Sequence, residues 1–229
     1  MVLTTHREKG GLFFVWVPVY YIACMNNNSL ANQESLRKVT MALKNHRYEV
    51  TVVKNGKEAL EEIKEIIPPR ASVMNGSSTT LEQIGYHEYL KSGKHPWVDL
   101  HANINAENDK EKRDKLRKES VLSDYYLGSV HALIENGEFV IASNSGSQLP
   151  HIVYTSPNLI FVVSTKKIVP DLDVAMKRLT DHVVPMEDKH MMQLYNFHTG
   201  LNKVLIFKGE AKVSTRKIHF ILVEENLGF

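Results

Sequence analysis

The sequence predicts an α/β protein of one domain, with a mainly parallel β-sheet and helices on both of its faces. Three observations carry this prediction. Helical and strand periodicities alternate through the first half of the chain, as they do in parallel sheets whose connections are helices. The chain has 229 residues, of which 43% are hydrophobic and 24% charged, so it can bury one large core. No internal repeat, low-complexity tract or interior linker indicates a second domain.

The first half of the chain holds the alternating elements. Leu36, Val39 and Leu43 recur at near-helical spacing in a stretch without Gly or Pro, which predicts a helix. A strand and the Asn55-Gly56 turn follow, and the next helix ends at Pro68-Pro69 because proline cannot continue the helical hydrogen bonding. In order, we expect a helix within residues 29–46, a strand at 48–53, a helix at 57–67, a strand at 71–74 and a helix carrying residues 81–89.

The second half begins with a charged segment and continues with short apolar runs. Between Asn105 and Lys118 acids alternate with bases, which predicts a solvated helix, whereas a basic surface for a binding partner would need few acids. Beyond it we expect strands at 125–127, 132–134 and 139–142 around a cleft, a buried strand at 159–164 and an amphipathic helix at 171–184. Strands at 203–207 and 218–223 are expected to close the same sheet.

Charge and composition exclude several classes of partner and cofactor. The chain carries 28 basic and 26 acidic side chains, so we expect no binding to nucleic acid or to an anionic membrane. Its single cysteine, Cys24, cannot form an internal disulfide, an iron–sulfur cluster or a thiolate zinc site. The 11 histidines include no His-x-x-x-His pair with a suitable carboxylate, so no metal is expected. The sequence thus predicts a cytoplasmic protein without a cofactor.

The N-terminal extension, residues 1–28, has its own composition. Basic residues precede an apolar run from Gly11 to Cys24, which is too short to span a bilayer. This pattern is similar to a secretory signal. Met25 then opens a polar stretch, and we favour the interpretation that translation begins at Met25, with the signal as the alternative.

Four stretches, taken in their order and spacing, resemble the LUD (lactate utilisation, DUF162) domain family. They are residues 73–85, 124–140, 167–173 and 218–229. The resemblance covers residues 29–229 and leaves residues 1–28 outside. It implies a fold like that of the NagB/RpiA/CoA transferase group, and a connection to the oxidation of lactate to pyruvate. The resemblance also implies iron–sulfur partner proteins and a small anionic metabolite as ligand, and because the chain has a single cysteine it would be the component without a redox centre.

A loop rich in hydroxyl groups, Asn75, Gly76, Ser77, Ser78 and Thr79, is the first candidate site. It lies between a predicted strand and a predicted helix, where free backbone N–H groups and the helix dipole favour an anion. Sugar-phosphate isomerases of the implied fold hold phosphate in a similar loop, so we expect a phosphate, carboxylate or CoA-type ligand. The alternative is helix capping by Ser78 or Thr79, with Glu82 completing a capping box.

The second candidate is Glu135-Asn136-Gly137, which is similar to the Glu-Asn-Gly element of class I CoA transferases. The glutamate of that element attacks acyl-CoA, so the resemblance implies that Glu135 is a catalytic nucleophile. We expect Glu135 to lie at the same cleft as the hydroxyl-rich loop. The alternative is a hairpin turn, because Asn-Gly between two apolar runs is a strong turn signal.

Two further groups complete the candidate site. Asn144, Gly146, Ser147 and Gln148 form a loop of small hydrogen-bonding residues, which would hold the polar end of a ligand or simply lie at the surface. Lys166 and Lys167 follow a buried strand, at the edge where open α/β sheets collect ligands, and Lys167 is expected to pair with an anion.

These features leave three functions open. The first is a non-redox LUD protein that binds a small anionic metabolite and serves lactate or organic-acid utilisation. The second is an enzyme that uses Glu135, either a CoA transferase or a sugar-phosphate isomerase. The third is an assembly or regulatory subunit for iron–sulfur oxidoreductases.

Overall fold

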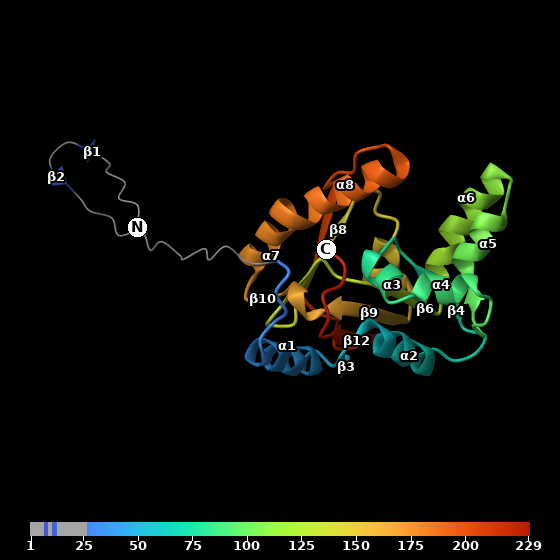
Figure 1. The fold of residues 1–229 in the computed structure, drawn as a ribbon, viewed down its shortest axis with the longest axis horizontal. Coiled ribbons are helices and arrows are strands. Elements are labelled where there is room, and N and C mark those ends of the chain that lie inside the picture. The colour runs from blue at the N-terminus through green and yellow to red at the C-terminus, as the bar shows by residue number, and fades with distance from the viewer. Residues whose placement is uncertain (1–6, 9–10, 13–26) are drawn as a thin grey trace.

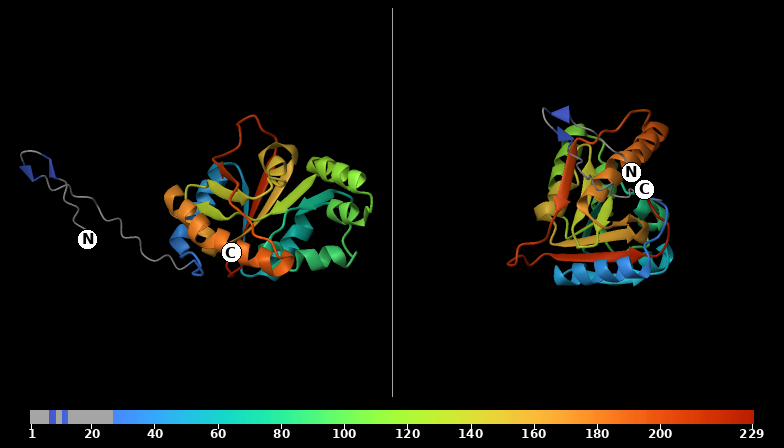
Figure 2. Two further views of the ribbon diagram at one scale, coloured as in Figure 1. Left: turned by 90° about the horizontal axis from the view of Figure 1, so that it is seen from above. Right: turned by 90° about the vertical axis from the view of Figure 1, so that its left-hand side faces the viewer.

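The computed structural model describes residues 7–8, 11–12 and 27–229, and within residues 27–229 it contains two β-sheets and the helices that cover them. Figure 1 shows α7 and α8 along one side of the strands and α1 and α2 along the other. The right-hand view of Figure 2 shows strands between the blue helix α1 below and the orange helices above. The predicted α/β architecture with a mainly parallel sheet is therefore confirmed.

The larger sheet has six strands, and every pairing in it is parallel. Its strands, in spatial order, are β3 (Glu49–Val53), β12 (Lys217–Val223), β9 (Asn158–Ser164), β6 (Tyr125–Gly128), β4 (Ser72–Asn75) and β5 (Val98–Asp99). Helix α1 (Gln33–Asn45) precedes β3, whereas α2 (Gly56–Ile66) connects β3 to β4, and α3 (Thr79–Gln83) and α4 (Tyr86–Lys91) lie between β4 and β5. The alternation of elements predicted from the first half of the sequence thus produces this sheet.

Both faces of the larger sheet are buried, because alternate residues of its central strands pack into separate hydrophobic clusters on the two faces. Phe161 of β9 and Phe220 of β12 pack with α1 on one face. Their neighbours Ile160 and Ile221 pack with α2, α3 and α4 on the other. Strands buried on both faces have apolar residues at successive positions, which is why these two runs read so clearly in the sequence.

The smaller sheet covers the first of those faces. Its four strands, in spatial order, are β10 (Ile168–Val169), β7 (Ala132–Ile134), β8 (Phe139–Ser143) and β11 (Lys203–Phe207). Phe139 of β8 joins the two sheets, with its ring 5.2 Å from that of Phe161 and 5.6 Å from that of Phe220. The expectation that residues 203–207 and 218–223 close one sheet is wrong, because β11 pairs with β8 whereas β12 pairs with β3 and β9.

A long helical segment covers the other face of the smaller sheet. It consists of α7 (Leu172–Arg178), a π-helical turn (Leu179–Val183) and α8 (Val184–Tyr195). Ala175, Leu179 and Val183 pack on Ala132 and Ile134 of β7. The sequence predicted this helix only as far as residue 184, because Pro185 reads as a stop. Proline is accepted in the first turn of α8, where its missing N–H is least costly.

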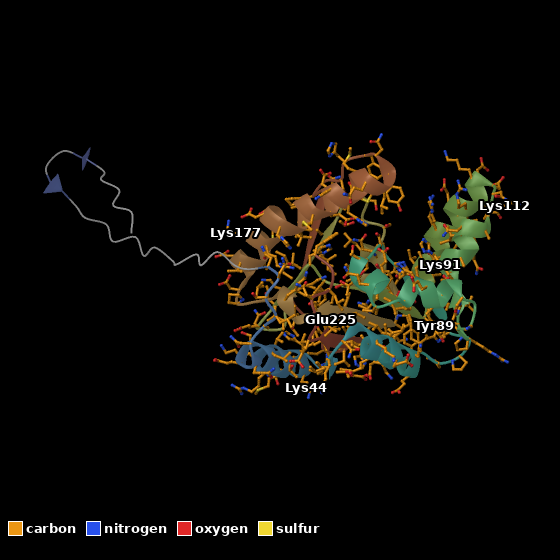
Figure 3. All side chains as sticks on the ribbon, viewed as in Figure 1. Lys44, Tyr89, Lys91, Lys112, Lys177 and Glu225 are labelled. Atoms are coloured by element: carbon orange, nitrogen blue, oxygen red, sulfur yellow. The ribbon has the colours of Figure 1, made fainter. Side chains whose placement is uncertain are left out.

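Two helices lie at the edge of the larger sheet, α5 (Leu100–Ala106) and α6 (Lys110–Glu119). No residue of α6 is buried, and Figure 3 shows Lys112 of this helix far from the strands. A single turn (Ser120–Leu122) leads from α6 into β6. The prediction of a solvated helix in the charged segment is confirmed.

Little of the N-terminal extension falls within the described residues. β1 (Arg7–Glu8) pairs antiparallel with β2 (Gly11–Leu12). Most of the apolar run from Gly11 to Cys24 lies outside the described residues. In the part of the chain that the structure describes, no helix is long and apolar enough to cross a membrane. Within the same residues, no three His, Cys, Asp or Glu side chains are grouped as metal ligands.

Candidate functional site

A cavity of about 440 Å³ lies among the loop after β4, the loop after β8 and helix α8. The segment from the end of β6 to the residue before β7, the segment after β9 and the end of the described chain complete its walls. Its lining includes Gly76, Ser77, Ser78, Thr79, Thr80, Ser129, His131, Asn144, Ser147, Gln148, Lys167, Glu187, Met191, Tyr195, Phe197 and Phe229. A volume of this size is within the range of small-molecule sites, about 300–1,000 Å³.

The structure brings most of the predicted binding residues to this cavity. The residues predicted for binding that line it are Gly76, Ser77, Ser78, Thr79, Asn144, Ser147, Gln148 and Lys167. Others do not line it, namely Asn75, Glu135, Asn136, Gly137 and Gly146. Two loops and one lysine, separated by long stretches of sequence, therefore meet as expected, and the Glu-Asn-Gly element does not join them.

The loop after β4 is held by its own backbone and by Tyr126. Ser78 is the N-cap of the five-residue helix α3, and its Oγ accepts a hydrogen bond from the N–H of Leu81 at 3.3 Å. The Gly76 backbone is hydrogen-bonded to the Tyr126 hydroxyl, and this bond lowers the pKa of Tyr126. Burial has the larger and opposite effect, so the pKa is raised overall. Asn75 is buried beside His87, with its Nδ2 3.2 Å from Nε2 of that ring. The capping alternative is thus present, and the hydroxyl groups of residues 77–79 still line the cavity.

The loop after β8 is closed by the side chains of Ser143 and Gln148. Ser143 Oγ donates to Gln148 Oε1 at 3.0 Å and accepts from the N–H of Gly146 at 2.8 Å. Gln148 Nε2 donates to the carbonyl of Ala142 at 3.2 Å. These bonds fix the loop so that Asn144, Ser147 and Gln148 reach the cavity wall.

Lys167 is the cationic residue of the cavity wall. Its side chain is only 5% exposed, and its Nζ donates to Thr80 Oγ1 at 3.0 Å and to Ser129 Oγ at 3.1 Å. Burial, with smaller contributions from the charges of Arg178 and Lys166, lowers the pKa of Lys167 to about 7. Among the described residues it forms no ion pair, and a protonated lysine has three hydrogens to donate. Its ammonium group therefore has room for one more acceptor.

Two other buried cations, Lys166 and Arg178, hold the last residues of the described chain. Lys166 Nζ donates to Asn226 Oδ1 at 2.6 Å and to the Gly228 carbonyl at 2.7 Å. Arg178 Nη2 donates to the Phe229 carbonyl at 2.8 Å. Neither cation forms an ion pair with an Asp or Glu side chain within the described part of the chain. The positive charge beneath the cavity is therefore not neutralised by an acidic side chain of these residues.

His131 adds a neutral ring to the same wall. Burial, together with the charges of Lys167 and Arg178, lowers its pKa to about 3. Its Nδ1 lies 3.1 Å from the N–H of Ala142 and accepts that hydrogen. The proton of the neutral ring is therefore on Nε2, so His131 has one N–H to donate.

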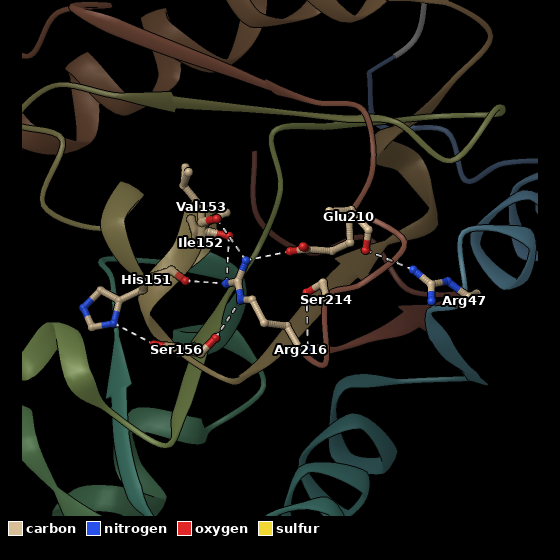
Figure 4. Close-up of polar contacts among 9 residues, drawn as sticks. Arg47, His151, Ile152, Val153, Ser156, Glu210, Ser214 and Arg216 are labelled. Carbon is tan, nitrogen blue, oxygen red and sulfur yellow. Dashed lines mark hydrogen bonds and ion pairs between the residues drawn. The ribbon is translucent and has the colours of Figure 1, made fainter.

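Arg216 holds the part of the cavity wall that contains Ile152 through hydrogen bonds to backbone carbonyls. Its guanidinium donates to the carbonyls of His151 and Ile152 at 2.7 and 2.9 Å and to that of Ser156 at 3.0 Å. The same group pairs with Glu210 at 2.6 Å, as Figure 4 shows. One half-buried side chain thus satisfies three carbonyls of the helical turn His151–Thr155, those of His151, Ile152 and Val153.

Glu135 lies in a hairpin turn that packs against α1. Its carboxylate accepts a hydrogen bond from Ser35 Oγ at 2.6 Å and lies 3.4 Å from Lys38 Nζ. The Asn136 carbonyl lies 3.1 Å from His46 Nε2, and Gly137 has a φ of +89°. The turn connects β7 to β8, which pair antiparallel. The hairpin alternative is therefore the local structure, and the Glu135 carboxylate contacts α1 rather than the cavity.

The sequence analysis missed the contribution of α8. Val184, Glu187, Met191 and Tyr195 line the cavity, and their spacing of three or four residues places them on one helix face. The spacing itself is present in the sequence, but the predicted helix ended directly before Pro185, so the later residues were not placed on it. Thr80 and Ser129, the partners of Lys167, were also missed, because only the folded chain brings them to it.

Two comparisons with known proteins place the chain in a family and identify a structure similar to it. A family model described as LUD domain matches residues 36–223. The chain therefore belongs to the LUD domain family. A solved structure, that of a DUF162 family protein from Deinococcus radiodurans, is similar to it with 13% sequence identity and a TM-score of 0.49, covering 85% of this chain and 99% of that one. No curated protein matches this chain.

Proposed function

We propose that this protein binds an anionic metabolite in the cavity and that Lys167 is the residue that pairs with its charge. One observation carries the proposal. The Lys167 ammonium is buried in the cavity wall with two hydroxyl partners and, within the described residues, no carboxylate. A buried charge without a counter-ion is costly, and an anion in the cavity would remove that cost.

The surroundings of Lys167 suit an anion in two further ways. Lys166 and Arg178 are buried nearby, and their charges act on Lys167 strongly enough to contribute to its lowered pKa. Ser129, Thr80 and the neutral ring of His131 offer donors without adding negative charge. An anion would thus meet one cation directly, two cations at longer range and several dipoles.

The family suggests the process in which such binding is used. We propose that the protein is a non-redox component of lactate or related organic-acid utilisation, acting in the cytoplasm with iron–sulfur partner proteins. The alternative of an assembly subunit differs in one respect, since it would leave the cavity without a ligand.

Ligand binding is tested by thermal unfolding in the presence of lactate, inorganic phosphate and a CoA compound. A ligand at one hundred times its Kd stabilises the native state by about 2.7 kcal/mol, so a rise in Tm is expected for at least one anion. Lys167→Met should abolish that rise. Lys112→Met, on the solvated helix α6, is the matched control and should retain it. The proposal would be contradicted if none of the anions raised the Tm. It would also be contradicted if the Tm of Lys167→Met rose as much as that of the unmodified chain.

The catalytic role predicted for Glu135 stays a separate proposal, and the substitution Glu135→Gln tests it. The carboxylate contacts Ser35 and Lys38 rather than the cavity, so the variant should bind the anion as the unmodified chain does. Acyl transfer from acyl-CoA in the unmodified chain, lost in Glu135→Gln with anion binding intact, would instead establish the glutamate as a nucleophile.

A further inference from the structure

We infer that the ligand of this cavity is an elongated anion with a planar ring, its anionic group at Lys167 and its ring at Tyr195 and Phe197. The inference rests on the proposed function and adds the chemical class of the ligand. It follows from the length of the cavity, the position of its cations and the position of its aromatic residues.

The cavity is long for a three-carbon acid. Its lining follows one face of α8 from Val184 to Tyr195, a distance of about 16 Å at 1.5 Å per residue. A lactate ion is only a few ångströms long and would occupy a fraction of the 440 Å³. The cavity therefore has space for a body attached to the anionic group.

The cations lie toward the N-terminal end of α8. Arg178 is in the preceding helix α7, one π-helical turn before Val184. Burial lowers the pKa of His182, which lies in that turn. The positive charges of Arg178 and Lys166 lower it further. Arg178 Nε donates to the His131 carbonyl at 3.1 Å, and Lys167 Nζ donates at 3.1 Å to Oγ of Ser129, two residues earlier. The anionic group of a ligand is thus expected near the start of α8.

The aromatic residues lie at the other end of the helix. Tyr195 and Phe197 both line the cavity and remain 63% and 47% exposed. Their ring centroids are 6.0 Å apart with an angle of 35° between the planes. Asn196 ends α8 with a φ of +54°, and this reversal places Phe197 beside Tyr195. Exposed aromatic faces of this kind stack on planar rings.

Glu187 lies between the two ends. It shares the cavity-lining face of α8 with Met191. A carboxyl group there would repel a second anionic group and would accept a hydrogen bond from a hydroxyl or amine. The ligand is therefore expected to carry its negative charge at one end only.

Two matched pairs of probes test the inference by titration calorimetry. The first pair is lactate and 3-phenyllactate, which differ by a ring; the second is ribose 5-phosphate and adenosine 5′-monophosphate, which differ by a planar base. The member with the ring should bind at least tenfold more tightly in one pair. The double variant Tyr195→Ala, Phe197→Ala should lose this advantage and keep its affinity for the ringless member.

The controls separate this inference from the proposed function. Leu194→Ala, an exposed residue of the same helix that does not line the cavity, should keep the advantage of the ring. Binding that needs Lys167 but is equal for both members of each pair would overturn the inference alone, as would a ring advantage that survives the double variant. Binding that is unchanged in Lys167→Met, or no binding of any probe, would overturn both.

Discussion

Lys167 gives the ligand-free protein a pH-dependent stability. Its pKa is about 7 in the folded chain and near 10.4 when unfolded, so between these values the unfolded chain binds more protons. The free energy of unfolding therefore rises as the pH increases from 7 to 9. Lys167→Met should reduce this rise, measured by urea denaturation at pH 7 and pH 9. An equal rise in both proteins would show that Lys167 has an ordinary pKa.

The same proton controls the affinity for an anion. Binding favours the protonated ammonium, so affinity for a carboxylate such as 3-phenyllactate should be constant below pH 7. Above that pH it should fall by up to about tenfold per pH unit. Calorimetry at pH 6, 7, 8 and 9 measures the trend. A constant affinity over this range would mean that another cation holds the anion.

Arg216 is the residue whose loss should cost the most stability. One guanidinium satisfies the carbonyls behind the cavity wall and pairs with Glu210. Arg216→Met leaves these partly buried groups unpaired, and hydrogen-bonding groups left without a partner cost about 1–3 kcal/mol. The matched control is Arg117→Met on α6, where an exposed ion pair of 3.7 Å should contribute under about 1 kcal/mol. Equal losses in chemical denaturation would contradict this assignment.

At the scale of the element, the turn at Gly137 depends on a residue without a side chain. A Cβ there would lie 2.7 Å from His46 Cδ2 of the segment after α1, and φ is +89°. Gly93 has a φ of +66° and nothing within 4 Å of such a Cβ. Both Gly→Ala substitutions should cost about 1 kcal/mol of strain, and Gly137→Ala should cost more. Denaturation that ranks them equally would mean that His46 moves aside freely.

Elements with strong local signals were predictable from the sequence, and those with conflicting signals were not. The helices α1 and α2 have Asn N-caps and apolar residues at helical spacing, and both were expected. The hairpin at Asn136-Gly137 was anticipated as an alternative to a catalytic element. α8 was missed because Pro185 reads as a stop, although proline in a first turn is compatible with a helix.

At the scale of the molecule, the assignment of strands to sheets was not predictable. Residues 203–207 and 218–223 have similar apolar composition, yet β11 and β12 enter different sheets. Pairing partners far apart in the sequence leave no local pattern. The same limit applies to the cavity: the sequence identified Lys167 and the loop at residues 76–79, whereas its hydroxyl partners and the separation of Glu135 depend on the packing of two sheets.

The central claim, that Lys167 holds an anion, is tested most directly by nuclear magnetic resonance of the lysine side chain. The chemical shift of its ¹³Cε, assigned by comparison with Lys167→Met, gives the pKa of this one group. Without ligand we expect a value of about 7, and a saturating carboxylate ligand should raise it by at least one unit. A pKa near 10.4 without ligand, or a value that the ligand does not change, would contradict the account.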